Sequence, residues 1–374
     1  MTSSVAGTAT ATVQGTDDYY VASQWTLMGR KFRRHVVARI SLLALIVIYL
    51  AGIFCEFLSP YGLETRDLGH VYAPPQRIRL LDWQQGRPGL FVYGYQLEID
   101  PETLRKSYTI DRTKKLPLRL FVRGEAYEMW GFIHSDRHLF GVAEGGVYLL
   151  GTDRLGRDMF TRILYGSRVS LSIGLVGVAL SLVVGVLLGG VSGYLGGGVD
   201  NAVQRLIEML RSIPTIPLWL GLSAAVPSTW PPLRVYLAIT IILSLIGWTG
   251  LARVVRGKLL SLREEDFVLA SRVCGASGFA VIIRHLIPGF LSYIIVSLTL
   301  SIPAVILGET SLSFLGLGLR PPVTSWGVLL KEAQNASTVA LYPWLMIPVL
   351  MVIVTVICFN FVGDGLRDAA DPYH

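Results

Sequence analysis

The chain has 374 residues, of which 52% are hydrophobic and 16% charged, and its formal net charge is +7. Soluble globular domains carry about 25% charged residues, so the composition argues against an ordinary soluble enzyme. The basic excess does not indicate a nucleic-acid partner, because no basic patch interleaved with aromatics and no zinc-finger spacing occurs. A membrane protein is expected to have this excess, because Lys and Arg concentrate in cytoplasmic loops.

The N-terminal segment, residues 1–35, is polar at first and ends in the basic stretch "GRKFRRH". The first apolar run follows at 36–58 and is about as long as a membrane-spanning helix. It has no convincing small-residue cleavage site. We therefore predict a cytoplasmic tail followed by a retained first span, and not a cleaved signal peptide.

The apolar runs predict six membrane spans, because a bilayer core of about 30 Å requires roughly 20 apolar residues per helix. A weaker candidate occupies 199–226: its first half is amphipathic, and its second half, from Ile213, is too short to span alone. We interpret these halves as one helix that begins in the cytoplasm and continues across. The five clear candidates are Val36–Leu58, Val169–Tyr194, Tyr236–Val255, Phe290–Leu307 and Trp344–Val362.

The distribution of Lys and Arg predicts the orientation of these spans. Basic residues gather in the N-terminal tail and in the loop 256–288, whereas the short stretch "PSTWPPLR" holds one Arg. By the positive-inside rule, both termini, including the tail 366–374, and the 256–288 loop are expected in the cytoplasm. The membrane core is then 169–365, with helices 2–6, preceded by an amphipathic lead-in at 149–168.

Residues 59–148, between the first two spans, read as an external domain. Short alternating runs such as "LFVYGYQLEI" and "LRLFVRG" are separated by Pro and Gly, which is typical of strands. The expected fold is therefore an all-α polytopic membrane protein of six helices with a small, β-rich periplasmic insertion.

A stripe of small residues marks the second span. Ser181, Gly185, Gly189 and Gly193 recur every fourth residue, a spacing that lets helix backbones approach closely in lipid. The stripe predicts tight helix packing, either beside a moving pathway or in a static seam.

Other features restrict the chemistry of the spans. Pro303 and Pro348 fall inside predicted spans and favour kinks. Glu309, near the outer end of the fifth span, faces the pathway or caps a helix; with Pro303 it is a pathway candidate. No phosphate-binding loop, catalytic pair or metal-ligand spacing occurs. We therefore predict no catalytic residue, no metal site and no bound cofactor in this chain.

The segment "EEDFVLASRVCGASGFAVIIRHLIPG", at 264–289, connects two spans with charged and small residues. Its Asp266 is a suitable N-cap, and Gly275 suits the left-handed residue that ends a helix. Ser277 can cap a second short helix. A helix that exposes small residues and one aromatic fits a groove in a partner. The residues predicted to make this contact or shape the segment are Asp266, Phe267, Ala270, Ser271, Cys274, Gly275 and Pro288.

This segment resembles the coupling loop, or EAA loop, of binding-protein-dependent ABC import permeases. The family pattern is E-A-A, three residues, G, nine residues, then I-x-L-P. Ala270, Gly275 and Pro288 match it, whereas Leu269 and Ser271 stand where the pattern has Glu and the second Ala. Two further stretches, "LLGTDRLGRDMFTRILYGSRVSL" and "GETSLSFLGLGLRPPVTSWGVLL", resemble the oligopeptide/dipeptide/nickel branch, second-permease type.

The resemblance implies a permease subunit with a type I core in the bacterial inner membrane. It implies four kinds of partner: a homologous second permease, two ATP-binding cassette ATPases that bind ATP and Mg, a periplasmic solute-binding protein and the lipid bilayer. It also implies that this chain forms half of the translocation pathway and works by alternating access. Peptides are the leading substrate; oligosaccharides, nickel and opine-like solutes are alternatives. The alternative from a different functional class is a membrane scaffold that does not transport any solute.

Overall fold

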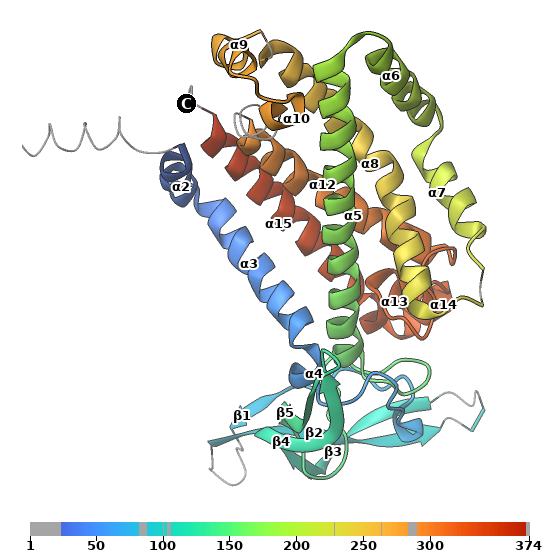
Figure 1. Cartoon of the computed structure of the whole chain (residues 1–374). Coiled ribbons are helices and arrows are strands. Elements are labelled where there is room, and N and C mark those ends of the chain that lie inside the picture. The colour runs from blue at the N-terminus through green and yellow to red at the C-terminus, as the bar shows by residue number, and fades with distance from the viewer. Residues whose placement is uncertain are drawn as a thin grey trace, which may run out of the picture.

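The computed structural model describes residues 24–81, 88–99, 101–102, 106–227, 229–262, 264–282 and 290–371. Within these ranges, five helices are long and apolar enough to cross a membrane, and each falls on one of the five clear spans predicted above, which are confirmed. Figure 1 shows a helical bundle with small sheets at one end. The five helices are α3 (Val36–Ile53), α5 (Met159–Leu195), α8 (Pro232–Leu262), α12 (Leu291–Phe314) and η3 (Pro343–Met346) continued by α15 (Ile347–Ala370).

The two ends of the described chain meet at one end of the bundle. Helix α2 (Gln24–Arg34) leads into α3, whose N-cap His35 accepts a hydrogen bond from the Ala38 amide at 3.1 Å. Ala38 is fully buried against Gly365 of α15, where an added Cβ would lie 2.4 Å from the Ala38 Cβ. The Lys31 ammonium donates to the Asp371 carbonyl at 2.8 Å. These contacts hold α2 and α3 along α15.

Helix α5 begins earlier than the sequence predicts. The Asp158 carboxylate caps it by accepting from the Thr161 amide at 2.8 Å, so the helix starts ten residues before Val169. The second half of the expected amphipathic lead-in at 149–168 therefore forms the first turns of α5, whereas its first half precedes the helix. The polar first turns belong to the helix because charged residues there, such as Arg162, are buried in ion pairs.

The expectation of one helix over 199–226 is wrong. The structure has two helices, α6 (Gly197–Ser212) and α7 (Thr215–Ala224), separated by an extended Ile213 with φ −87° and ψ 128°. Pro214 explains the break: it lacks an amide donor, and its ring disfavours helical backbone at the preceding residue. The ten residues of α7 extend for about 15 Å.

The prolines of the last two spans differ in position. Pro303 lies inside α12, which continues on both sides of it, and its side chain is buried. Pro348 lies in the first turn of α15, where a missing amide donor removes no helical hydrogen bond. Pro348 therefore stands at the start of α15, directly after η3, and not in the interior of that helix.

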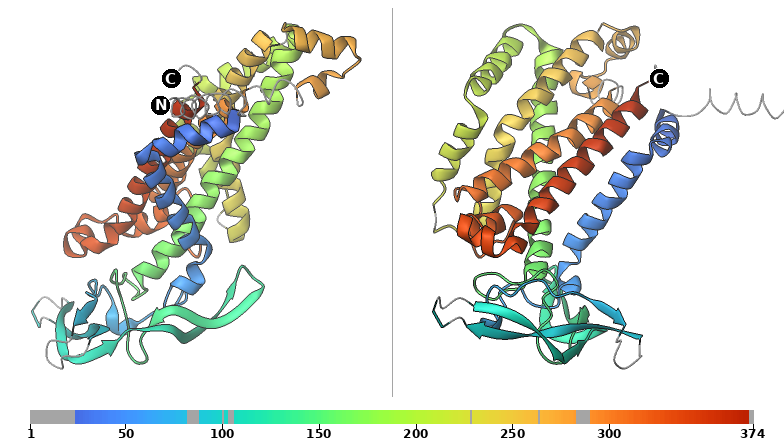
Figure 2. Two further views of the ribbon diagram at one scale, coloured as in Figure 1. Left: turned by 90° about the vertical axis from the view of Figure 1, so that its left-hand side faces the viewer. Right: turned by 180° about the vertical axis from the view of Figure 1, so that it is seen from behind.

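The segment at 59–148 contains a small sheet region. An antiparallel three-stranded sheet has the order β1-β2-β3, with β1 (Arg79–Leu81), β2 (Pro88–Ile99) and β3 (Lys106–Pro117). A separate hairpin pairs β4 (Arg119–Met129) with β5 (Ile133–Gly141). Short helices α4 (Cys55–Leu58) and η1 (Leu68–His70) precede the strands. Figure 2 shows both sheets at the end of the bundle where α3 ends.

Four short helices complete the described chain. Helices α9 (Asp266–Val273) and α10 (Gly278–Val281) connect α8 to α12 at the end away from the sheets. Helices α13 (Trp326–Glu332) and α14 (Ala336–Leu341) follow α12 at the opposite end. The main apolar core lies between α5, α8, α12 and α15 and includes fully buried Ile173, Ile239 and Ile306.

Candidate functional site

Helix α9 is attached to the bundle through one face. Its Val268 side chain is fully buried in an apolar cluster with Val255 and Leu259 of α8 and Val281 of α10. In both views of Figure 2, α9 and α10 lie at the tip of the bundle. The remaining described faces of α9 are thus free to meet another molecule.

Beside the exposed Asp266, several apolar side chains lie on those faces. Phe267 and Leu269 each expose nearly half of their surface, and Val273 exposes 88%. Ala270 and Cys274 are exposed as well. Water contact with large apolar side chains is unfavourable by about 25 cal/mol per Å², so a covering partner would be stabilising. We call the exposed side chains of these five residues the α9 surface.

The turn after α9 requires a glycine for its backbone angle. Gly275 has φ +83°, and the Ala276 amide donates to the Ser271 carbonyl at 3.0 Å, which forms a Schellman motif. A Cβ added to Gly275 would meet no atom within 4 Å among the described residues. The Ser277 hydroxyl accepts from the Ala280 amide at 3.3 Å, as predicted for the cap of α10.

The start of α9 differs by one residue from the prediction. Asp266 is the first helical residue of α9, and the Glu265 carbonyl accepts from the Val268 and Leu269 amides at 3.0 and 3.1 Å. The predicted N-cap is therefore one residue late. Pro288, together with the rest of 283–289, lies outside the described residues.

The α9–α10 connection lies against the end of α5. A Cβ added to Gly278 would lie 2.5 Å from the Tyr194 ring, and one added to Gly193 would lie 2.9 Å from the Arg256 carbonyl of α8. The Arg256 guanidinium pairs with the Asp200 carboxylate of α6 through hydrogen bonds from its Nε and Nη2 atoms. Helices α5, α6, α8 and α10 therefore meet beside the α9 surface.

The predicted glycine stripe lies in this α5–α8 contact. A Cβ added to Gly189 would lie 2.5 Å from the Ala252 carbonyl oxygen, and one added to Gly185 would lie 3.0 Å from the Leu251 Cβ. Larger side chains would push the two backbones apart. A shift of α8 would thus be passed directly to α5.

The pathway candidate Glu309 is enclosed by hydroxyl groups. Its carboxylate accepts from Ser313 at 2.7 Å, from Ser325 at 2.6 Å and from Ser170 at 3.2 Å, and the side chain is fully buried. Ser325 also caps α13. In this conformation Glu309 therefore joins α12 to α5 and α13. Whether Glu309 and buried Pro303 ever face a pathway stays a prediction.

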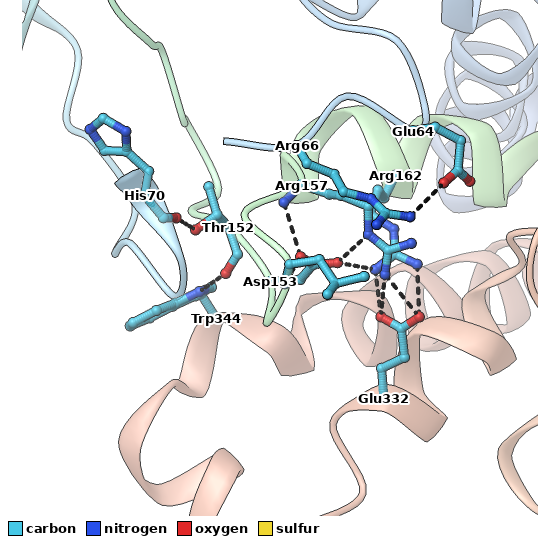
Figure 3. A network of polar contacts seen from close by, with 10 residues as sticks. Glu64, Arg66, His70, Thr152, Asp153, Arg157, Arg162, Glu332 and Trp344 are labelled. Carbon is cyan, nitrogen blue, oxygen red and sulfur yellow. Dashed lines mark hydrogen bonds and ion pairs between the residues drawn. The ribbon is translucent and has the colours of Figure 1, made fainter. Parts of the chain in front are cut away.

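A buried network of charges lies at the end of the bundle near the sheets (Figure 3). The Arg162 guanidinium donates to Asp153 and to Glu332, each at 2.6 Å, and Arg157 donates to Asp153 at 2.7 Å and to Glu332 at 3.2 Å. The side chains of Arg162 and Asp153 expose 1% and 3% of their surface. The network joins the start of α5 to the end of α13.

The network changes the acidity of its own carboxyl groups. Burial by itself would raise the pKa of Glu332, but the hydrogen bonds and charge of Arg162, with the charge of Arg157, lower it overall. Next to the network, Asp158 is fully buried, and burial raises its pKa to about 6. The Asp158 Oδ1 atom has no hydrogen-bond partner among the described residues. The network thus favours the charged form of Glu332, whereas burial makes Asp158 easier to protonate than an exposed aspartate.

Together, these features define a multi-pass membrane protein with an exposed apolar surface at one end and a sheet region at the other. The chain belongs to the family of binding-protein-dependent transport system inner membrane components, whose model matches residues 181–373, more than half of the chain. A second model, described as the N-terminal TM domain of oligopeptide transport permease C, matches residues 23–75.

Curated relatives carry similar sequences. The oligopeptide transport system permease protein OppC of Haemophilus influenzae is 41% identical over 228 residues, covering 61% of this chain and 71% of the relative. The dipeptide transport system permease protein DppC of Bacillus subtilis is 41% identical over 222 residues, covering 59% and 68%. A solved structure of the inward-facing MetNI methionine ABC transporter is 20% identical, with a TM-score of 0.44, and covers 56% of this chain and 97% of that one.

Proposed function

We propose that the chain is the permease subunit that forms half of the translocation pathway of an ATP-driven peptide importer. Family membership argues for transport over a membrane scaffold, and similar relatives are oligopeptide and dipeptide permeases. The observation that carries the mechanism is the α9 surface: apolar side chains held outward on a helix whose end is fixed by Gly275.

The proposed partners at the α9 surface are the ATPase subunits, which would bind ATP and Mg. Movement of a docked ATPase would displace α9 and α10. The displacement would reach α8 through Val268 and α5 through the Gly278–Tyr194 contact. A ligand shifts a conformational equilibrium only through different affinities for the two states, so ATP acts on the pathway through this contact. A homologous second permease would supply the other half of the pathway.

We propose six crossings, with α6 and α7 together as the third. Figure 1 shows these helices descending from the α9 end to the sheet end, where α8 begins its return. Helix α2 lies at the α9 end and carries Lys31, Arg33 and Arg34 in its last turn. The positive-inside rule then places α9 and both termini in the cytoplasm, and the sheets in the periplasm beside the solute-binding protein.

Native Cys274 provides a test of this orientation. It is exposed on the α9 surface, whereas Cys55 and Cys358 are buried. With the chain produced without its ATPase subunits, which would cover the α9 surface, we expect an impermeant maleimide to label Cys274 in inside-out vesicles and not in intact cells with a permeabilised outer membrane. Asp136→Cys, at an exposed position on β5, should show the reverse in a Cys274→Ser background. Labelling of Cys274 from the periplasmic side would contradict the proposed topology.

The substrate is tested by mass spectrometry of the ligand retained by the co-purified solute-binding protein. We expect short peptides, followed by ATP-dependent uptake of the same peptides into proteoliposomes that contain the complete transporter. Retention and uptake of an oligosaccharide, a nickel chelate or an opine-like compound would replace the peptide assignment and leave the permease role intact. Empty binding protein and no uptake of any of these solutes would contradict both.

A further inference from the structure

The tip of the β4–β5 hairpin exposes large apolar side chains. Phe132 exposes 68% of its surface, Trp130 44% and Ile133 39%. The rings of Trp130 and Phe132 lie side by side, with their centroids 5.8 Å apart. Exposing such a group to water on a periplasmic loop is unfavourable. The question is therefore what covers these side chains.

The backbone of the hairpin turn is unusual for the tryptophan that occupies it. Trp130 has φ +56° and is followed by Gly131 at φ +79°. Two successive left-handed residues form the tight hairpin turn that Asn-Gly or Asp-Gly usually occupies, because those residues tolerate positive φ. A bulky aromatic residue is uncommon there. Trp130 therefore strains the backbone of the turn, and asparagine at this position would not. This strain indicates that the indole ring has a function.

The tip lies where the first membrane span ends. The Trp130 indole donates to the Ile53 carbonyl, the last residue of α3, at 3.0 Å. Its ring also lies 5.5 Å from that of Phe54. The last turn of α3 exposes Leu50 and Ile53 on the outside of the bundle. The aromatic tip is thus continuous with the apolar surface of a membrane-spanning helix.

We propose that the tip, residues 129–133, is seated in the interfacial layer of the bilayer and anchors the hairpin to lipid. Tryptophan is enriched at this layer because its ring is apolar and its N–H needs a polar partner. Here the Ile53 carbonyl supplies that partner, which leaves the ring face and Phe132 for acyl chains. The orientation proposed above makes this the outer leaflet; burial in lipid itself does not depend on that orientation.

The test places an environment-sensitive fluorophore at the tip. The full-length chain, assembled with its transport system in nanodiscs, carries Phe132→Cys in a Cys274→Ser background. The matched control is Asp136→Cys, on the same hairpin, where the native side chain forms an exposed pair with Arg123. Phosphatidylcholine carrying a nitroxide near the head group, or near the end of the acyl chain, serves as the quencher. The Cys274→Ser chain without a new cysteine measures background labelling.

We expect the label at position 132 to emit at shorter wavelength than the label at 136 and to be quenched most by the shallow nitroxide. Trp130→Asn should keep the turn, because Asn tolerates positive φ, yet reduce this quenching. Equal water exposure at 132 and 136 would overturn the proposal. So would protection at 132 that appears only when the binding protein is added, which would identify a protein partner. The vesicle labelling of Cys274 tests orientation separately.

Discussion

Gly275→Val is expected to reduce coupled transport strongly while the protein still inserts into the membrane. The left-handed region costs an L-residue about 1–2 kcal/mol, and a β-branched residue is worse. Because an added Cβ meets open space, the strain acts on the backbone alone. It would open the Schellman turn and reorient the α9 surface. We expect at least about a tenfold loss of transport, which corresponds to a loss of about 1.4 kcal/mol from the free energy of docking between the α9 surface and the ATPase.

The matched control is Gly275→Asn, because asparagine adopts positive φ with little cost. In reconstituted complexes, this variant should retain most transport and most stimulation of ATP hydrolysis by loaded binding protein. Ala270→Trp tests the α9 surface without changing the backbone of the turn. It adds bulk to that surface, so it should also uncouple transport from ATP hydrolysis. Wild-type transport by both Gly275→Val and Ala270→Trp would show that α9 does not transmit the movement of the ATPases.

The sequence was informative about the spans because hydropathy is a local property. Each long apolar run became a helix, since unpaired backbone groups cannot be left in lipid. The prediction of one helix over 199–226 fails at Pro214, although the proline is a local signal too. Steric conflict between the proline ring and the preceding residue is stronger than the tendency of the amphipathic pattern to continue. Gly275 was predictable for the same local reason as the spans, because the end of a helix followed by a glycine is a short-range signal.

The buried charge network could not be predicted from the sequence. Asp153 and Arg157 lie close together in the chain, but Glu332 lies 175 residues after Arg157 and is brought to them only by the packing of α13 against α5. Nothing local distinguishes Glu332 from a solvated surface residue. The hairpin tip presents a similar difficulty. Alternation predicts strands there, whereas the contact between Trp130 and Ile53 depends on how the hairpin folds back to α3.

Arg162→Ala is expected to destabilise the folded protein by about 3–5 kcal/mol, the range measured when one partner of a buried ion pair is removed. Arg157 would then be the one remaining ion-pair partner that the described residues offer Asp153 and Glu332, with the charge of Arg154 nearby. Part of the negative charge in a site almost without solvent would lose its direct partner. The measurement is the midpoint of thermal unfolding of the purified chain in nanodiscs. Arg66→Ala is the control. Its pair with Glu64 is half-exposed at 3.6 Å, and such pairs contribute only about 0–1 kcal/mol.

The difference between wild type and Arg162→Ala should depend on pH in a definite direction. The pKa of Glu332 is lowered in the folded protein, so its ion pairs contribute stability above the unfolded-state pKa of about 4.3. That contribution is lost as pH falls through the lowered, folded-state pKa. The two proteins should therefore differ most near neutral pH and differ less in acid, where a protonated Glu332 no longer forms an ion pair with Arg162 and the Arg162–Asp153 pair is left. A difference that is constant across this range would mean that the ion pair between Arg162 and Glu332 contributes nothing to stability.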